Sequence, residues 1–136
     1  ALEKSMEMIF GEGLGNVYKR HNMLSRACKA GVAALGLEIF TKPGCGSDVE
    51  TVFTVPDGVD GSKLVKRMLE RFGLMISGGQ EPYKGKIARI AHMGYCTEHD
   101  MILVLAGLEM CLAEAGFCKI SGGAVRAAEE VFQDEA

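Results

Sequence analysis

The sequence has no excess of positive charge and no run in which basic and aromatic residues alternate. Its 15 lysines and arginines are outnumbered by 18 acidic residues, which gives a net charge of -3. Proteins that bind nucleic acids do so largely through the phosphates, and this requires a basic surface. A nucleic-acid partner is therefore disfavoured.

A long apolar run and a secretory leader are also missing. The longest strongly apolar run, 101–108, is interrupted by Glu109 and is far shorter than the roughly 20 residues that cross a bilayer. The first residues include neither an initiator methionine nor the apolar stretch of a signal peptide. We therefore expect a soluble, cytoplasmic protein with no membrane partner, and we expect the chain to begin inside a longer protein and to end at an acidic natural terminus.

The cysteines form no CxxC pair and no regular framework. Their number is odd, which suits a reducing compartment, so we interpret all of them as free thiols. Cys45 lies among glycines with no adjoining histidine or lysine-rich helix start, and this favours an ordinary loop cysteine over a reactive thiol. The five are Cys28, Cys45, Cys96, Cys111 and Cys118.

No set of metal ligands is complete in the sequence. Cys96, His99 and His92 offer three potential zinc ligands, but they bracket a turn and a helix start and have no fourth partner. His21 interrupts an apolar helical stripe and has no second ligand one turn away, which favours a hydrogen-bonded packing histidine over a ligand or a catalytic base. The sequence predicts no metal site.

Apolar periodicity and capping residues predict four helices. Small or apolar residues recur at spacings of four and three over 10–35, which predicts a long first helix, and the glycines at 11, 13 and 15 favour a break or a kink in its first half. Asp60 or Ser62 caps a helix that Gly73 ends, and residues 97–100 form a capping box ahead of the helix that we expect to be the most buried. The last predicted helix runs from 121 or 122 to 133.

Four extended segments are predicted between the helices, at 37–40, 49–55, 74–76 and 85–94. The third and fourth are joined by the glycine-containing loop 77–85, which favours a hairpin-like antiparallel pair. The order of elements predicts one α+β domain over 1–136, with a small, mostly antiparallel sheet of three to four strands and the helices packed on it.

Arg89 lies in the middle of the otherwise apolar segment 85–94. It shares one strand face with Ile87 and Ala91, because side chains alternate along a strand. A guanidinium keeps its charge, so a half-buried one requires a carboxylate, a phosphate or several carbonyls as partner. Two explanations stay open at this point: an edge strand whose Arg89 reaches water, or a strand whose Arg89 holds a ligand.

The segments 77–79 and 84–94, followed by Asp100 and by Leu108 with Glu109, resemble the C-terminal small domain of class V, fold-type I pyridoxal-phosphate aminotransferases. The resemblance is greatest to the alanine-glyoxylate and serine-glyoxylate aminotransferases and to a relative known as a soluble hydrogenase subunit. Residues 20–21, 34–37 and 55–58 fit the same pattern in the same order. The resemblance therefore extends over nearly the whole chain.

The resemblance implies that Arg89 binds the α-carboxylate of the substrate, in an enzyme that moves an amino group from alanine or serine to an α-keto acid such as glyoxylate or pyruvate. It also implies a homodimer and pyridoxal 5'-phosphate as cofactor. In that family the lysine that carries the cofactor, and most phosphate contacts, belong to a large domain that these residues lack. We therefore assign no catalytic or cofactor-binding residue here, and we expect the 136 residues alone to be inactive and not to hold the cofactor.

The chain departs from the family pattern at Ala91, where glycine is common, and in the loop 80–83, which is usually glycine-rich and apolar. Both departures bear on the choice of substrate. An alternative of another class is a free-standing α+β module that forms homodimers and has no catalytic activity. A third, less favoured interpretation is a redox protein that uses its cysteines or a metal.

Overall fold

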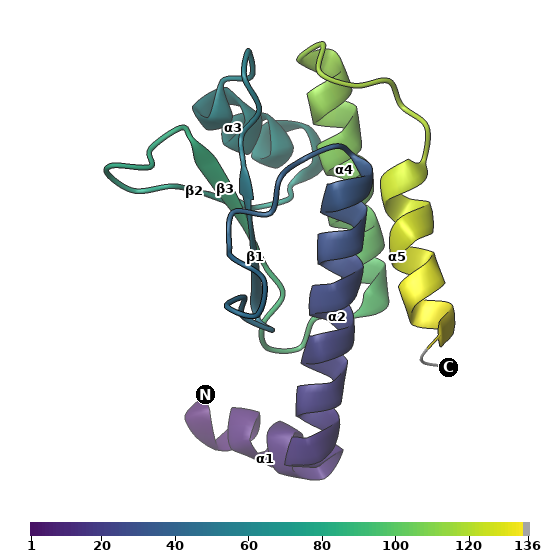
Figure 1. The fold of residues 1–136 in the computed structure, drawn as a ribbon. Helices are drawn as coiled ribbons and strands as arrows, with labels where there is room; N and C mark the ends of the chain where they lie inside the picture. Colours follow the sequence, from purple (N-terminus) through teal and green to yellow (C-terminus); the bar gives the residue numbers. More distant parts are fainter. Residues whose placement is uncertain (135–136) are drawn as a thin grey trace.

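The computed structural model describes residues 1–134 and confirms the predicted α+β class (Figure 1). Along this range the helices are α1 (Leu2–Glu12), α2 (Leu14–Ala34), α3 (Gly61–Phe72), α4 (Glu98–Glu114) and α5 (Gly123–Asp134). The strands are β1 (Glu50–Thr54), β2 (Ser77–Gly78) and β3 (Ile87–Ala91).

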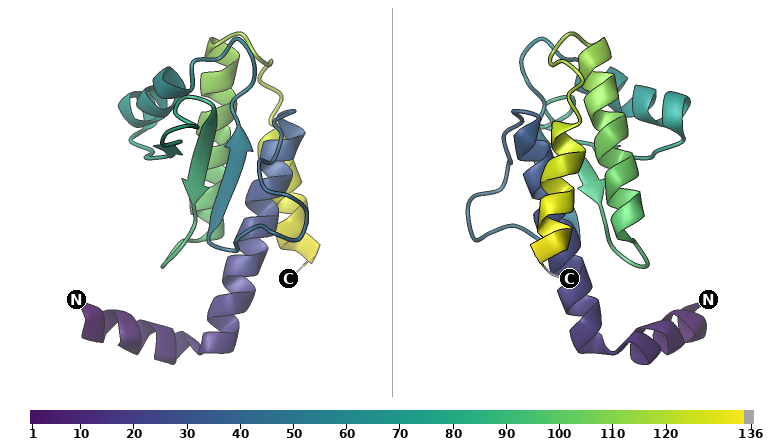
Figure 2. Two further views of the ribbon diagram at one scale, coloured as in Figure 1. Left: turned by 60° about the vertical axis from the view of Figure 1, so that its left-hand side comes forward. Right: turned by 90° about the vertical axis from the view of Figure 1, so that its right-hand side faces the viewer.

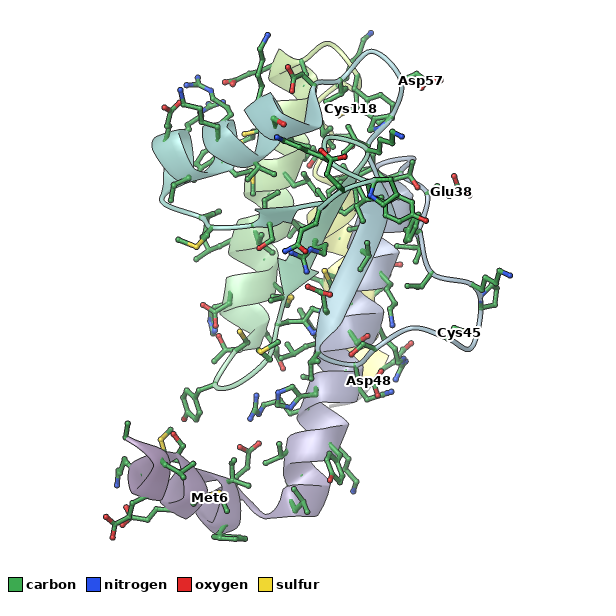
Figure 3. The ribbon with its side chains drawn as sticks, turned by 90° about the vertical axis from the view of Figure 1, so that its left-hand side faces the viewer. Met6, Glu38, Cys45, Asp48, Asp57 and Cys118 are labelled. Atoms are coloured by element: carbon green, nitrogen blue, oxygen red, sulfur yellow. The ribbon has the colours of Figure 1, made fainter. Side chains whose placement is uncertain are left out.

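The three strands form an antiparallel sheet in the order β1-β3-β2. Helices α2 and α4 lie against one face of this sheet, and α5 packs behind them (Figures 1 and 2). Ala88 and Ile90 of β3 are buried on that side, whereas Arg89 and Ala91 lie on the opposite, open face. Figure 3 looks at the open face, with the helices behind it.

The core is centred on α4, as the sequence predicted. Leu105, Leu108 and Leu112 of this helix are completely buried. Gly31 of α2 allows the close approach of the helices, because a Cβ atom there would lie 2.5 Å from Leu105 Cδ1 and 2.9 Å from the Ala124 carbonyl oxygen. Three helices therefore meet at one glycine.

The predicted break in the first helix occurs at Gly13, whose φ of 85° separates α1 from α2. L-residues rarely adopt this conformation, so glycine is the residue that fits there. α1 turns away from the axis of α2 and projects from the body of the molecule (Figure 2). None of its residues, 2–12, is buried.

Two predicted strands are wrong in detail. The segment 37–40 makes only one bridge, between Ile39 and Phe53, because the chain leaves the sheet edge at once for the loop 41–49. The segment 74–76 is not a strand either. There the Leu74 amide donates to the Met68 carbonyl and closes the end of α3, after Gly73 has taken a left-handed conformation. The strand that pairs with β3 begins at Ser77 instead, so the antiparallel pairing is confirmed but starts later.

The predicted caps are confirmed. Asp60 accepts hydrogen bonds from the amides of Ser62 and Lys63, and Thr97 and Asp100 form a reciprocal capping box at the start of α4.

Candidate functional site

Arg89 lies on the central strand of the sheet. Its backbone neighbours are Val52 on β1 and Ser77 on β2, and its side chain is 33% exposed on the open face. The edge-strand explanation is therefore wrong, because both sides of β3 are paired. A charged side chain on the middle strand of a small sheet is held there by its partners rather than by free access to water.

The Arg89 guanidinium has a partner on each neighbouring strand. Its Nε donates to the Gly78 carbonyl oxygen at 3.2 Å, and its Nη1 lies 3.4 Å from Glu50 Oε1. Nη2 has no hydrogen-bond partner among residues 1–134. The group is thus oriented by the sheet while one end of its planar fork remains able to bind a ligand oxygen.

Packing explains Gly79, the second glycine of the Gly78-Gly79 pair beside Arg89. A Cβ atom on Gly79 would lie 2.2 Å from the Tyr83 carbonyl oxygen and 2.7 Å from Ile87 Cγ1. The glycine lets the loop 79–86 fold back against the start of β3. It thereby fixes β2, whose carbonyl holds Arg89.

His92 follows β3 and is fully buried against the helices. Its Nε2 lies 3.0 Å from Thr51 Oγ1, and its Nδ1 has no partner among the described residues. Burial, with the nearby positive charge of Lys29, lowers the pKa of His92 to about 4. Burial also raises the pKa of the Cys28 thiol to about 11. At neutral pH the histidine is uncharged and the cysteine is a protonated thiol, so neither carries a charge there and Cys28 is not the nucleophilic thiolate.

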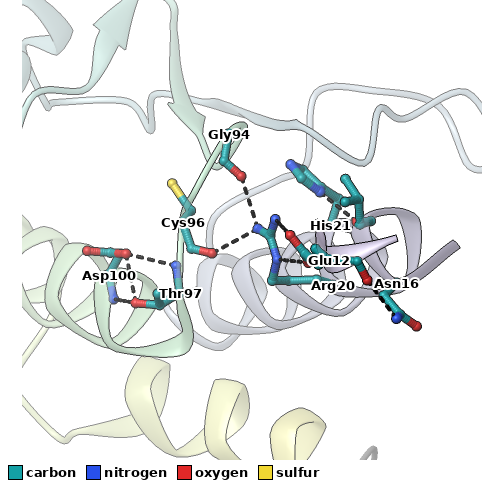
Figure 4. Close-up of polar contacts among 9 residues, drawn as sticks. Glu12, Asn16, Arg20, His21, Gly94, Cys96, Thr97 and Asp100 are labelled. Carbon is teal, nitrogen blue, oxygen red and sulfur yellow. Dashed lines mark hydrogen bonds and ion pairs between the residues drawn. The ribbon is translucent and has the colours of Figure 1, made fainter. Parts of the chain in front are cut away.

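Arg20 ties α1 to the loop that follows β3 (Figure 4). Its Nε and Nη2 donate to the two carboxylate oxygens of Glu12 at 2.7 and 2.9 Å. Its Nη1 donates to the carbonyl oxygens of Gly94 and Cys96 at 3.0 and 3.1 Å. The Glu12 pKa is lowered, chiefly by the hydrogen bond from Arg20. All three nitrogens of Arg20 are occupied, so its role is structural.

His21 is the packing histidine that the sequence predicted. It is buried, and its Nδ1 lies 2.7 Å from the Val17 carbonyl oxygen, to which it donates (Figure 4). No group of three potential metal ligands occurs among residues 1–134. Cys96 donates to the Met93 carbonyl and His99 is exposed at the start of α4.

The five cysteines are free thiols, as predicted. Cys45 is exposed on the loop 41–49, which leaves the sheet edge, and Figure 3 shows it at the outer end of that loop. Among residues 1–134, none of the helices combines the length and the hydropathy of a membrane-spanning segment.

Glu109 is a residue whose role the sequence did not reveal. Although it belongs to α4 and is only 3% exposed, its Oε1 accepts from the amides of Ser121 and Gly122 at 2.9 and 3.1 Å and from Ser121 Oγ at 3.0 Å. It thus caps the start of α5 from another helix. An acidic residue within an apolar helix is the signal that could have indicated such a partner.

Comparison with known proteins identifies the relatives of this chain. An uncharacterized aminotransferase of Methanocaldococcus jannaschii is 36% identical over 135 residues, which are 99% of this chain and 35% of that protein. The serine–glyoxylate aminotransferase of Methylorubrum extorquens is 36% identical over 134 residues, 98% of this chain and 33% of that protein. Several relatives of the chain are named aminotransferases, and others are named soluble hydrogenase subunits. No family model matches the sequence.

The fold agrees with this relationship. The crystal structure of ureidoglycine–glyoxylate aminotransferase from Bacillus subtilis matches 93% of this chain with a TM-score of 0.89 and 35% identity. The match covers 33% of that structure. The chain therefore spans about a third of the length of the aminotransferases that it matches. Over that segment, the resemblance to aminotransferases that the sequence predicted is confirmed.

The aminotransferase relationship implies pyridoxal phosphate, and the residues described here do not fit its attachment. Among residues 1–134 every lysine except Lys29 is exposed. Lys29 is half-buried, and its Nζ donates to Ser25 Oγ at 2.7 Å and to the Ser47 carbonyl at 3.1 Å. A lysine that forms a covalent bond with a cofactor is instead activated by desolvation in an apolar pocket or by a neighbouring cation. This part of the chain supplies no such lysine.

Proposed function

We propose that this chain is the C-terminal, substrate-carboxylate-binding domain of a larger pyridoxal-phosphate-dependent aminotransferase. The parent enzyme transfers the amino group of a small amino acid, alanine or serine, to an α-keto acid such as glyoxylate or pyruvate. It acts as a cytoplasmic homodimer. The cofactor and the lysine that carries it belong to the large domain, so the 136 residues alone are inactive.

The observation that carries this proposal is the arrangement of Arg89. Its guanidinium lies on the open face of the sheet, anchored through Nε and Nη1, and its Nη2 has no hydrogen-bond partner among residues 1–134. A carboxylate suits such a planar guanidinium group. Two parallel N–H···O bonds attract the carboxylate's negative charge and also fix its orientation. The names of the relatives, glyoxylate aminotransferases among them, supply the substrate class.

The test is the activity of the full-length protein. Purified with pyridoxal phosphate and given L-alanine or L-serine with glyoxylate, it is expected to form glycine and the corresponding keto acid. The 136-residue chain given the same mixture is expected to form none. A full-length protein that starts just before Ala1 and lacks transaminase activity would overturn the proposal.

The surface of α1 supports a second candidate, a module that forms dimers without catalysis. Leu2 is 77% and Phe10 69% exposed, and no described element covers them. Exposed apolar side chains that gather on one helix favour contact with another protein surface. Sequencing upstream of Ala1 separates the two candidates: about 250 preceding residues favour the aminotransferase, whereas an initiator immediately before Ala1 favours the module.

A further inference from the structure

Glu50 shares the open face of the sheet with Arg89. It lies on β1 opposite Ala91, two residues along from Val52, which is the direct partner of Arg89. Its side chain is 30% exposed, and its Oε1 lies 3.4 Å from Arg89 Nη1. Diagonal neighbours on one face of an antiparallel pair are close enough for such long side chains to meet.

This contact places a fixed negative charge beside the proposed ligand position. A carboxylate that binds the Nη1 and Nη2 edge of Arg89 must share Nη1 with Glu50 or displace it. The pair is neutral before a ligand arrives, so one bound carboxylate leaves the site with a net charge of -1, and a second carboxylate on the same ligand makes it more negative. Like charges this close repel each other strongly where water is partly excluded.

We infer that Glu50 is a specificity-determining residue, which competes with the ligand carboxylate for Arg89 and disfavours dicarboxylates relative to monocarboxylates. The inference rests on the proposed function, in which Arg89 binds the substrate carboxylate. In this inference Glu50 takes no part in a chemical step. It acts by lowering the affinity of Arg89 for any carboxylate, and it does so most for ligands that bring a second negative charge.

The test is isothermal titration calorimetry of the full-length protein with propionate and with succinate, at fixed pH and ionic strength. Glu50→Gln removes the charge and keeps the shape of the side chain. We expect it to tighten propionate binding about 3- to 10-fold, and succinate binding by a larger factor. Glu38→Gln is the matched control: this carboxylate is exposed at the edge of the sheet (Figure 3), and its removal is expected to leave both affinities unchanged.

The outcomes separate the inference from the proposed function. Loss of propionate binding in Arg89→Lys, together with unchanged affinities in Glu50→Gln, overturns the role of Glu50 and leaves that of Arg89 intact. Weaker binding in Glu50→Gln also overturns it, because Glu50 would then hold Arg89 in place rather than compete for it. Unchanged binding in Arg89→Lys overturns both. Glu50 is half-exposed at the surface, so Glu50→Gln is expected to fold, and its circular dichroism spectrum checks this.

Discussion

At the scale of single residues, His92 makes the stability of the chain depend on pH. It is fully buried and its pKa is about 4, against about 6.5 in an unfolded chain. As the pH falls from about 6.5 to about 4, the unfolded state takes up a proton that the folded state does not. The folded state is therefore expected to lose about 3 kcal/mol over this range, a loss that is complete below the folded pKa.

Urea unfolding at several pH values measures this loss. His92→Gln is expected to show a shallower fall in the free energy of unfolding between pH 6.5 and pH 4 than the wild type. His99→Gln, which changes an exposed histidine, is expected to keep the wild-type slope. Equal slopes in all three proteins would show that His92 is not buried in its neutral form.

At the scale of elements, the contact of α2 with α4 and α5 depends on Gly31. Its replacement by alanine would place Cβ against Leu105 and the Ala124 carbonyl, so Gly31→Ala is expected to destabilise the fold by about 1–3 kcal/mol. Gly15 belongs to the same helix and has no atom within 4 Å of an added Cβ. Gly15→Ala is therefore expected to be neutral or slightly stabilising. Thermal unfolding measures the difference. Equal changes of the melting temperature in the two variants would contradict the close packing at Gly31.

Glu109 connects α4 to the start of α5. Glu109→Ala removes the acceptor of three hydrogen bonds in a site that is 3% exposed, and we expect a loss of about 2–3 kcal/mol in urea unfolding. Glu109→Gln keeps an acceptor oxygen and is expected to lose less. Hydrogen exchange should accelerate at the amides of Ser121 and Gly122. Glu130→Ala, an exposed change on α5, serves as control, and equal effects of the two alanine variants would argue against the cap.

The elements that were predictable from the sequence are those whose signals are local. The cap at Asp60, the capping box of residues 97–100 and the break at Gly13 depend on residues within one turn of each other. The segment 74–76 was predicted as a strand because its residues are apolar, but its backbone is engaged by the end of α3. The apolar composition of this segment does not indicate that its backbone is already hydrogen-bonded to the end of α3.

For the candidate site, too, one part was predictable from the sequence and another part was not. The need of Arg89 for a carboxylate or carbonyl partner follows from its position in an apolar strand. Its actual partners, Glu50 and the Gly78 carbonyl, depend on the register of three strands that lie far apart in the sequence. The cap that Glu109 provides depends likewise on how α5 returns to α4. Such contacts are set by tertiary packing, so a single sequence indicates that a partner is needed without identifying it.

At the scale of the whole molecule, α1 is a helix with exposed apolar side chains that projects from the body of the domain (Figures 1 and 2). Its exposed Leu2 and Phe10 would be covered in a larger protein or in a dimer. The 136-residue chain alone is therefore expected to associate as its concentration rises in sedimentation velocity experiments. Phe10→Glu is expected to weaken this association, whereas Met75→Glu, at an exposed site remote from α1, is not. If the chain sediments as a monomer at every concentration, the exposed apolar side chains of α1 do not drive association.

The central proposal is that Arg89 binds a substrate carboxylate, and the kinetics of Arg89→Lys in the full-length protein test it most directly. Lysine keeps the charge but loses the planar fork, so kcat/KM for L-alanine or L-serine with glyoxylate is expected to fall about 100-fold, with a raised KM for the amino acid. Arg126→Lys, at an exposed position on α5, is expected to have wild-type kinetics. Wild-type kinetics in Arg89→Lys would contradict the account.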